Sequence, residues 1–593
     1  MQLKLIRLRF RRRLRRGQQQ VGGLGSQTEK QLDRHFVKRL GNLAPIRRFV
    51  AAWILLLVLL IAGLFVQNLS LSNYFQTLRP VPGGIYNEGI LGTFTNANPM
   101  YATNDVDTSV SKLLFAGLFT FNDQNKLAGD LASGYKVDPT GTVYTVRLRP
   151  HLTWQDGQPL TSADVVFTYQ AIQNPDAQSP LQSSWQNITV TAPDARTVVF
   201  KLPGALASFP STMTNGIVPK HILGKVPAAG LRSAEFNTVH PVGAGPFTWQ
   251  AIQVAGDDPS VAQEQIALVP FAGYSRGDPK LREFIVHAYV SKAKLTQAFE
   301  SGRLTGAAGF TTVPENIKKK HSLETHSSLL TAATMVFFKT TGGVLSDTNV
   351  RQAVVEGTNR QAIIKGLGYS THAVREPLLL GQPGYDPSLA QAGFDPSAAR
   401  KILDSNGWVV GKNGVRGKNG QALSFTLTAA DTPESRLVTR QLHDQWKNIG
   451  VQLKVQLQDS TDFHNSLVYH NYDAVLYGIS IGADPDVFVY WDSSQADIHS
   501  SNRLNLSEYK NVIADSSLEA GRSRSEPALR AVKYRPFLQE WQKDYPALGL
   551  YQPRFLYLTN GPVAGLSDHA VNSPAGRFNN VQNWEIREAK VTE

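Results

Sequence analysis

Residues 144–169 read YTVRLRPHLTWQDGQPLTSADVVFTY and carry the clearest structural signal in the chain. Their first six residues alternate apolar and polar side chains, which is the two-residue period of a half-buried strand. Asp156-Gly157 predicts a tight turn, and Pro159, which has no N–H to donate, is expected to end the return pairing. Thr161 and Asp164 have the spacing of a helix N-cap and its acidic partner at N3. The segment therefore predicts a strand, a turn and a capped helix in close succession.

This order and spacing resemble the extracytoplasmic solute-binding proteins of ABC transporters, specifically family 5, the class that captures oligopeptides, dipeptides or nickel chelates. The resemblance covers roughly residues 85–560 and implies a binding protein rather than an enzyme. No catalytic group is implied by the segment itself. Further segments that resemble the family are 98–99, 110–118, 217–222, 241–247, 349–353, 392–394, 406–408, 411–420, 484–486 and 544–551.

The resemblance also implies the fold class. This is an α/β protein of the periplasmic-binding-protein-like type II fold, in which two lobes joined by a hinge close on a ligand. The chain is expected to cross between the lobes near Thr331–Thr340 and Leu548–Leu556, where strand-forming residues are frequent. The expected parts are lobe I at residues 80–121, 212–332 and 549–593, an inserted subdomain of lobe I at 122–211, and lobe II at 333–548.

Strand and helix patterns alternate along the chain, which independently indicates α/β layering. Residues 424–428 read as a strand, 435–449 as an amphipathic helix and 451–455 as another alternating strand. Such a β–α–β unit supports a parallel sheet.

Of the net charge of +13, the N-terminal tail carries +12. Residues 1–48 hold 14 Lys and Arg against two acids, which leaves 46 basic and 45 acidic residues for the rest of the chain. A nearly neutral body lacks the broad positive surface that binds nucleic acid, so no nucleic-acid partner is expected. The tail itself is interpreted as a topogenic cluster that can also lie on anionic lipids.

Residues 49–66 predict a transmembrane anchor. These 18 residues are uncharged and almost wholly apolar, and at about 1.5 Å per residue they nearly span a hydrocarbon core of about 30 Å. The basic tail before them places the N-terminus in the cytoplasm and the body outside, after a linker at 67–79. A cleavable signal peptide is the alternative, and the small residues Ser70 and Ser72 would permit cleavage.

The chain contains no cysteine. Disulfides, thiolate metal sites and cysteine nucleophiles are therefore excluded. The lipid-modified cysteine that commonly tethers such binding proteins is excluded too, so the apolar helix is expected to replace it. The 13 histidines are scattered without the spacing of a helical zinc site, and neither a metal nor another cofactor is expected.

Gly273-Tyr274-Ser275-Arg276-Gly277 matches the G-x-S-x-G pattern of serine hydrolases. That chemistry needs a strand leading into the turn and a helix starting at the serine. Pro279 disfavours a helix there, so the match is expected to be a turn before a strand at 284–286. A serine hydrolase remains a remote alternative.

The resemblance also points to candidate ligand-binding residues. Peptide-binding relatives hold the ligand's amino terminus with an aspartate where this chain has Ile481, and oligopeptide binders have a tryptophan where it has Gly478. An isoleucine cannot pair with an ammonium group, so the cleft is expected to take a less charged ligand, use another acid or bind peptides in a shifted register. The predicted ligand-binding residues are Thr103, Asn104, Asp107, Trp185, Tyr477, Gly478, Ile481 and Asp484, and Trp185 is equally interpreted as a core residue.

The prediction is thus a monomeric, membrane-anchored extracellular protein that captures peptides or peptide-like ligands. Its expected partners are the permease and ATPase subunits of an ABC transporter, which recognise the closed form. The alternative is a sensor or adhesion protein that uses the same fold without a transporter.

Overall fold

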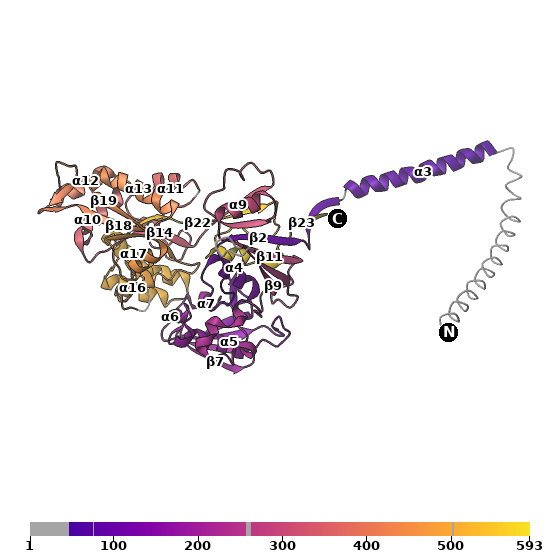
Figure 1. Cartoon of the computed structure of the whole chain (residues 1–593), viewed down its shortest axis with the longest axis horizontal. Helices are drawn as coiled ribbons and strands as arrows, with labels where there is room; N and C mark the ends of the chain where they lie inside the picture. The colour runs from indigo at the N-terminus through magenta and orange to yellow at the C-terminus, as the bar shows by residue number, and fades with distance from the viewer. Residues whose placement is uncertain (1–46, 75, 256–262, 370, 501–502, 593) are drawn as a thin grey trace. The chain divides into compact units, whose positions relative to one another are not determined.

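The computed structural model describes residues 47–74, 76–255, 263–369, 371–500 and 503–592. These residues form two compact units. One contains the N-terminal helix α3 and the paired strands β1 and β23, and the other, called the body here, runs from Pro80 to Arg587 (Figure 1).

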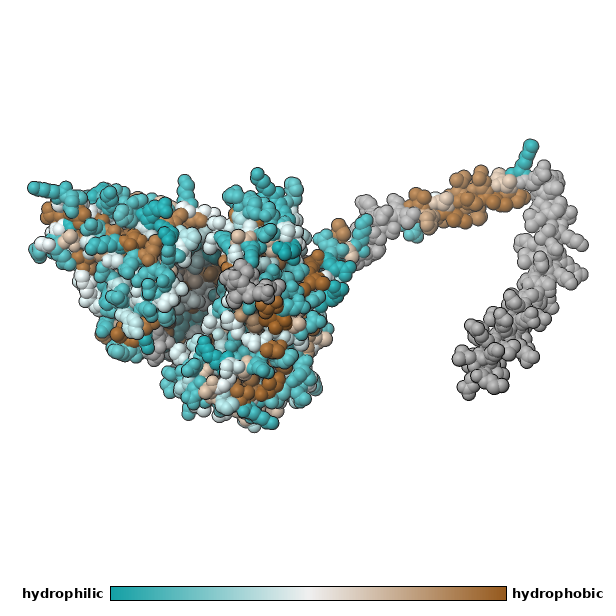
Figure 2. All heavy atoms as spheres, in the orientation of Figure 1, coloured by the Kyte–Doolittle hydropathy of each residue, from teal (hydrophilic) through white to brown (hydrophobic). Residues whose placement is uncertain are grey.

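Helix α3 spans Arg47–Tyr74. Within it, Arg48–Asn68 is long and apolar enough to cross a membrane, and none of its window is buried in the protein. Figure 2 shows its side chains as a continuous apolar surface. The helix extends beyond Val66 into the predicted linker, because residues 67–74 contain no Pro or Gly that would end it. The first part of the predicted linker is thus helical, and nearly all of the predicted basic tail lies outside the described residues.

Strand β1 (Gln76–Val81) also falls largely within the predicted linker. It pairs with β23 (Arg587–Thr592) in a sheet of two strands. The first and last described strands of the chain are therefore hydrogen-bonded to each other.

A seven-stranded sheet organises the first part of the body, named lobe I. Strand β2 pairs in parallel with β11 and β12, and the other neighbours are antiparallel. Helices α4 (Asp105–Leu114) and α9 (Lys292–Glu300) pack against β2. In sheet order the strands are β13 (Leu323–Leu329), β22 (Arg554–Asn560), β12 (Gly306–Phe310), β2 (Ile85–Leu91), β11 (Glu283–Tyr289), β10 (Gln263–Pro270) and β9 (Phe247–Ala255).

Lobe I also carries a four-stranded antiparallel sheet and several short elements. The sheet is covered by α5 (Ser162–Gln173), which packs against β7 and β8. Its order is β5 (Ala132–Val137), β6 (Val143–Leu148), β8 (Thr197–Lys201) and β7 (Thr189–Asp194). The short elements are β3 (Phe119–Phe121), β4 (Leu127–Gly129), α6 (Gln182–Trp185), α7 (Phe209–Thr212) and α8 (Lys220–Leu223).

The predicted strand, turn and capped helix are present in this region. Thr161 and Asp164 form the capping box of α5, and the Thr161 N–H donates to Asp164 Oδ2 at 2.8 Å. The prediction for Pro159 was wrong. The Leu160 N–H donates to Leu152 O at 3.0 Å, so pairing continues past the proline, whose missing donor faces away from this bond.

A five-stranded sheet organises the rest of the body, named lobe II. As predicted, β18 and β19 are parallel and are connected by α13 (Pro433–Lys447). In sheet order the strands are β19 (Gln452–Gln458), β18 (Ser424–Ala430), β20 (Ala474–Ser480), β14 (Ala332–Phe338) and β21 (Ala547–Tyr551). The glycine-rich segment at 411–420 lies in a small sheet of β15 (Val409–Val410), β16 (Arg416–Lys418) and β17 (Gln421–Ala422).

Helices enclose the five-stranded sheet, and α16 packs along α17 (Figure 1). Their aromatic side chains are buried, among them Trp446 of α13 and Trp541 of α17. The helices are α10 (Thr348–Glu356), α11 (Arg360–Leu367), α12 (Pro396–Ser405), α14 (Ser460–Val468), α15 (Phe488–Trp491), α16 (Val512–Arg522) and α17 (Pro527–Asp544), in addition to α13.

The chain passes between the two larger sheets twice. It leaves β13 for β14 through Leu330 and Thr331, and returns from β21 to β22 through Gln552 and Pro553. The buried apolar residues of the two lobes belong to separate clusters. Separate cores joined by two short connections are typical of lobes that move relative to each other.

Candidate functional site

Thr331 joins three segments at the first crossing. Its carbonyl accepts the N–H groups of Ile481 at 2.9 Å and Gly482 at 3.0 Å, which directly follow β20. Its hydroxyl donates to Asn572 Oδ1 at 2.6 Å. The end of β20 in lobe II is thus hydrogen-bonded to the crossing segment. So is the loop of lobe I at residues 572–579, called the C-terminal loop here.

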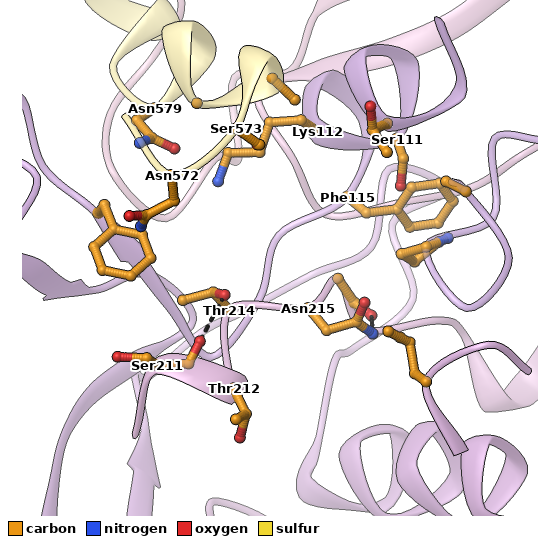
Figure 3. Close-up of a pocket in the computed structure, with 18 of the residues that line it drawn as sticks. Ser111, Lys112, Phe115, Ser211, Thr212, Thr214, Asn215, Asn572, Ser573 and Asn579 are labelled. Atoms are coloured by element: carbon orange, nitrogen blue, oxygen red, sulfur yellow. Dashed lines mark hydrogen bonds between the residues drawn. The ribbon is translucent and has the colours of Figure 1, made fainter. Parts of the chain in front are cut away.

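Asn572 forms part of a pocket in lobe I with a volume of about 450 Å³. Figure 3 shows the pocket between α4, the loop after α7 and the C-terminal loop. Serine, threonine and asparagine side chains dominate its polar lining. The lining residues are Pro99, Ala102, Thr108, Ser111, Lys112, Phe115, Phe121, Leu181, Ser184, Trp185, Ser211, Thr212, Thr214, Asn215, Gly216, Asn572, Ser573, Ala575, Gly576 and Asn579.

The two lobes also meet beyond the pocket. The Ala207 N–H donates to the carbonyl of Arg522, at the end of α16, at 2.8 Å. Ala207 comes shortly before α7, which supplies Ser211 and Thr212 to the pocket. The pocket therefore borders the crossing segment through Asn572. On its other side, helix α7 begins two residues after Ala207, which makes the contact between the lobes.

The predicted residues at the start of α4 have mainly a structural role. Asn104 is the N-cap, and its side chain accepts the Asp107 N–H at 2.9 Å. The buried Asp107 carboxylate accepts from Thr95 N, Thr95 Oγ1, Asn96 N and Asn104 Nδ2 at 2.5–3.1 Å. Thr103 is exposed. Asp107 is thus occupied by its own loop, while Thr103 remains accessible.

Trp185 is both a core residue and a pocket residue. Only 2% of it is exposed, and it stacks on Tyr169 with ring centroids 3.9 Å apart. It nevertheless lines the pocket. The two interpretations of this residue are therefore compatible.

The predicted residues of β20 differ in exposure. Tyr477 and Gly478 pair with Met335 and Thr334 of β14, and Gly478 is exposed, with open space where a side chain would lie. The pairing of β20 with β18 covers residues 474–476, so residues 477–480 lie beyond that ladder. Ile481 is buried in the core of lobe II. The end of β20 therefore exposes its backbone at Gly478.

The acids that follow β20 are ion-paired. Asp484 pairs with Arg530 of α17, and Asp486 pairs with Arg522 of α16 at 2.8 Å. Burial raises the pKa of Asp484, and the Arg530 guanidinium opposes that shift. Each of these carboxylates thus already has a cationic partner within lobe II.

Lys112 is the charged residue of the pocket, and the sequence interpretation did not select it. It comes from α4, and its ammonium donates to Thr120 Oγ1 at 2.8 Å. Burial lowers its pKa to about 8, against the opposing attraction of Asp130. Figure 3 shows its ammonium directed toward the interior of the pocket.

A buried ion pair holds the pocket wall that contains Asn572 and Asn579. Arg577 donates to Glu88 Oε1 through Nε at 3.1 Å and through Nη2 at 2.8 Å. The Tyr557 hydroxyl donates to the other oxygen of the Glu88 carboxylate. Glu88 lies on β2, so the C-terminal loop is fixed to the centre of the seven-stranded sheet.

The G-x-S-x-G match lies in a turn between β10 and β11. Ser275 Oγ donates to Asp130 Oδ1 at 2.6 Å, and no helix starts at the serine. The strand predicted at 284–286 is β11. Among the residues that the structure describes, no group of three or more His, Cys, Asp or Glu could hold a metal ion. The local geometry required for a serine nucleophile is thus not met here.

Comparisons with known proteins agree with this architecture. The oligopeptide-binding protein AppA of Bacillus subtilis (strain 168) is 25% identical over 559 residues, covering 91% of this chain and 99% of that protein. Its solved structure, in complex with a nonapeptide, matches with a TM-score of 0.69 and 23% identity over 86% of this chain and 100% of that one. NikZ of Campylobacter jejuni in complex with Ni(L-His) matches with a TM-score of 0.70 and 22% identity over 85% and 99%.

The family model for bacterial extracellular solute-binding proteins, family 5 (middle), matches residues 126–500. The match includes the four-stranded sheet, most of lobe II and the capped helix that gave the first signal in the sequence. The chain therefore belongs to the bacterial extracellular solute-binding proteins of family 5, and it has their α/β periplasmic-binding-protein-like fold.

Proposed function

We propose that this protein captures peptides or peptide-like solutes outside the membrane and delivers them to an ABC permease. The observation that carries the proposal is the linkage through Thr331. This residue connects the exposed backbone end of β20 to the rim of a polar pocket in lobe I. An extended ligand can pair with a strand edge through its main chain while a side chain or terminus enters a pocket.

The hinge supports delivery as well as capture. A ligand that touches both lobes favours the closed arrangement by its difference in affinity for the two states. A permease that recognises the closed arrangement is thereby presented mainly with loaded protein. The similarity to AppA of Bacillus subtilis, named as an oligopeptide-binding protein, favours peptides as the solute class.

The test uses the full-length protein purified in detergent. Native mass spectrometry should detect co-purified solutes, and added peptides of two to nine residues should shift the tryptophan fluorescence. Absence of any bound peptide in both measurements contradicts the proposal. Peptide uptake by cells that lack this protein then separates a transport role from a sensor, since loss of a sensor leaves uptake unchanged.

We further propose that α3 anchors the protein and replaces a lipid tether. Its 28 residues and the apolar stretch Arg48–Asn68 support this role. The protein should remain in membranes after an alkaline carbonate wash, with its N-terminal residues intact. A mature chain that starts near residue 73 and is released by the wash contradicts the anchor.

A further inference from the structure

The pocket of lobe I is polar but lacks acidic residues. Among the described residues that line it, the polar ones are serines, threonines, asparagines and Lys112, and none is Asp or Glu. The hydroxyl groups of Ser111 and Ser573 make no hydrogen bond to the described part of the chain and can donate to a ligand. Hydroxyl donors beside an ammonium form an environment that favours an anionic group.

Lys112 retains unused hydrogen-bonding capacity. An ammonium has three donors, and within the described ranges only Thr120 Oγ1 accepts from it. No described carboxylate lies within 4.0 Å of its Nζ atom. A partly buried ammonium without an ion pair is costly, and a ligand carboxylate would remove that cost.

The acids beside the pocket and at the end of β20 are already occupied. Asp107 accepts four hydrogen bonds from its own loop, and Asp484 and Asp486 are paired with arginines. Ile481, which follows β20, is aliphatic and buried. The charge that this region offers to a ligand is therefore positive.

We propose that Lys112 binds a carboxylate of the captured solute, so that the solute enters the lobe I pocket with an anionic group. The proposal rests on the proposed function and specifies its ligand class. The carboxylate is either the C-terminus of a peptide or an acidic side chain. In both cases Lys112 supplies the ion pair and the serine hydroxyls supply neutral donors.

The titration of Lys112 supports this assignment. Its pKa is lowered to about 8 by burial first, and Arg276 contributes to the lowering while Asp130 opposes it. Thr120 is the neutral group that contacts the ammonium. Because the carboxylate binds the protonated form, affinity should be constant below about pH 8 and fall above it. A bound carboxylate raises the pKa of Lys112, so the fall continues up to the pKa of the complex.

The experiment compares wild-type protein, Lys112→Met and Lys112→Arg, each full-length in detergent. The probes are random pools of peptides with two to nine residues, prepared with either free or amidated C-termini. A second pair of pools carries Glu or Gln at one internal position. Retained peptides are quantified by mass spectrometry, and the Kd of the best members is measured by fluorescence between pH 6 and 10.

We expect the acidic peptides to bind the wild type at least tenfold more tightly than their neutral counterparts in one of the two comparisons, free against amidated C-terminus or internal Glu against Gln. Lys112→Met should abolish that preference and the pH dependence, whereas Lys112→Arg should keep the preference. Lys126→Met, which removes an exposed lysine, is the matched control and should behave as wild type. Thermal unfolding without ligand verifies that each variant is folded.

The outcomes separate the two proposals. If the wild type binds the acidic peptides and their amidated or Gln counterparts with equal affinity, the role of Lys112 is overturned and peptide capture is left intact. A preference for acids that survives in folded Lys112→Met also overturns it. Wild-type protein that binds no peptide of either kind overturns both proposals.

Discussion

The charged side chains beside the candidate site are ion-paired in lobe II, whereas the lysine in the lobe I pocket has no ion pair among the described residues. In lobe II, Asp484 and Asp486 are both held in ion pairs with helix residues. In lobe I, Lys112 reaches the pocket with one neutral hydrogen-bond partner. A charge that is already ion-paired within the protein is less available to a ligand than a charge without an ion pair. Under the proposal for Lys112, lobe I recognises the charge of the ligand and lobe II contributes backbone.

The largest effect is expected from breaking the ion pair behind the lobe I pocket. Arg577→Met leaves the fully buried Glu88 without its cation. We expect a loss of about 3–5 kcal/mol in the free energy of unfolding, measured by urea denaturation, together with weaker ligand binding. Arg282→Met, at an exposed position, is the control and should cost little. A change below about 1 kcal/mol for Arg577→Met would show that this wall is held by other contacts.

Glu376 in lobe II is buried, and one of its carboxyl oxygens has no hydrogen-bond partner among the described residues. Burial raises its pKa to about 8, above its value in the unfolded chain. The folded form therefore loses relative stability as the pH rises from about 4.5 to about 8, where the unfolded form alone is ionised. Glu376→Gln removes this loss and should stabilise the protein by about 2 kcal/mol at pH 8.

The measurement for Glu376→Gln is the thermal midpoint across pH 4 to 9. The gain should be small near pH 4.5 and grow toward pH 8, since Gln does not titrate. A gain that is independent of pH would assign the effect to packing rather than to the carboxyl group.

A smaller loss of stability is expected when the ion pair of Asp484 in lobe II is removed. Arg530→Met leaves Asp484 unpaired, and because that carboxylate is about one-third exposed we expect a cost of about 1–2 kcal/mol. Peptides with a free amino terminus should then gain about two- to fivefold in affinity relative to acetylated ones. The control is Arg535→Met, which removes an arginine paired with Asp386 elsewhere on α17. Unchanged selectivity would mean that Asp484 does not face the ligand.

The smallest effect on stability is expected from Thr161, which lies outside the pocket lining and the segment that follows β20. Thr161→Ala removes the N-cap of α5 and should cost about 1 kcal/mol of stability. Ligand affinity should be unchanged, as measured by fluorescence titration at a temperature where the variant is folded. A loss of affinity would show that the four-stranded sheet is coupled to the site.

Local features of the fold could be predicted from the sequence. The capping box of α5 and the β18–α13–β19 unit depend on neighbouring residues, so their patterns are sufficient. The error concerns Pro159, past which the pairing continues, and the predicted linker at 67–79 contains helix and strand. Residues 67–74 contain no Pro or Gly that would end the helix. At Pro159, the missing N–H faces away from the hydrogen bond that continues the pairing.

The candidate site could be predicted only in part. Trp185, predicted as a ligand-binding or core residue, is buried and lines the pocket, whereas Ile481 is buried in the core of lobe II. Lys112 was missed because a lysine on an amphipathic helix normally faces solvent. The loops at 211–216 and 572–579 carry no motif, and only the folded chain brings them to α4. The assignment of the eight predicted residues to ligand contacts remains a prediction.

The hydrogen-bonded pair of β1 and β23 has a mechanical consequence. Within the described residues, the main chain enters lobe II from β13 to β14 and leaves it from β21 to β22. If α3 is held in a membrane, tension on it divides between the first and the last strand and bypasses lobe II. Lobe II then carries none of this tension, so tension on α3 does not oppose closure of the two lobes.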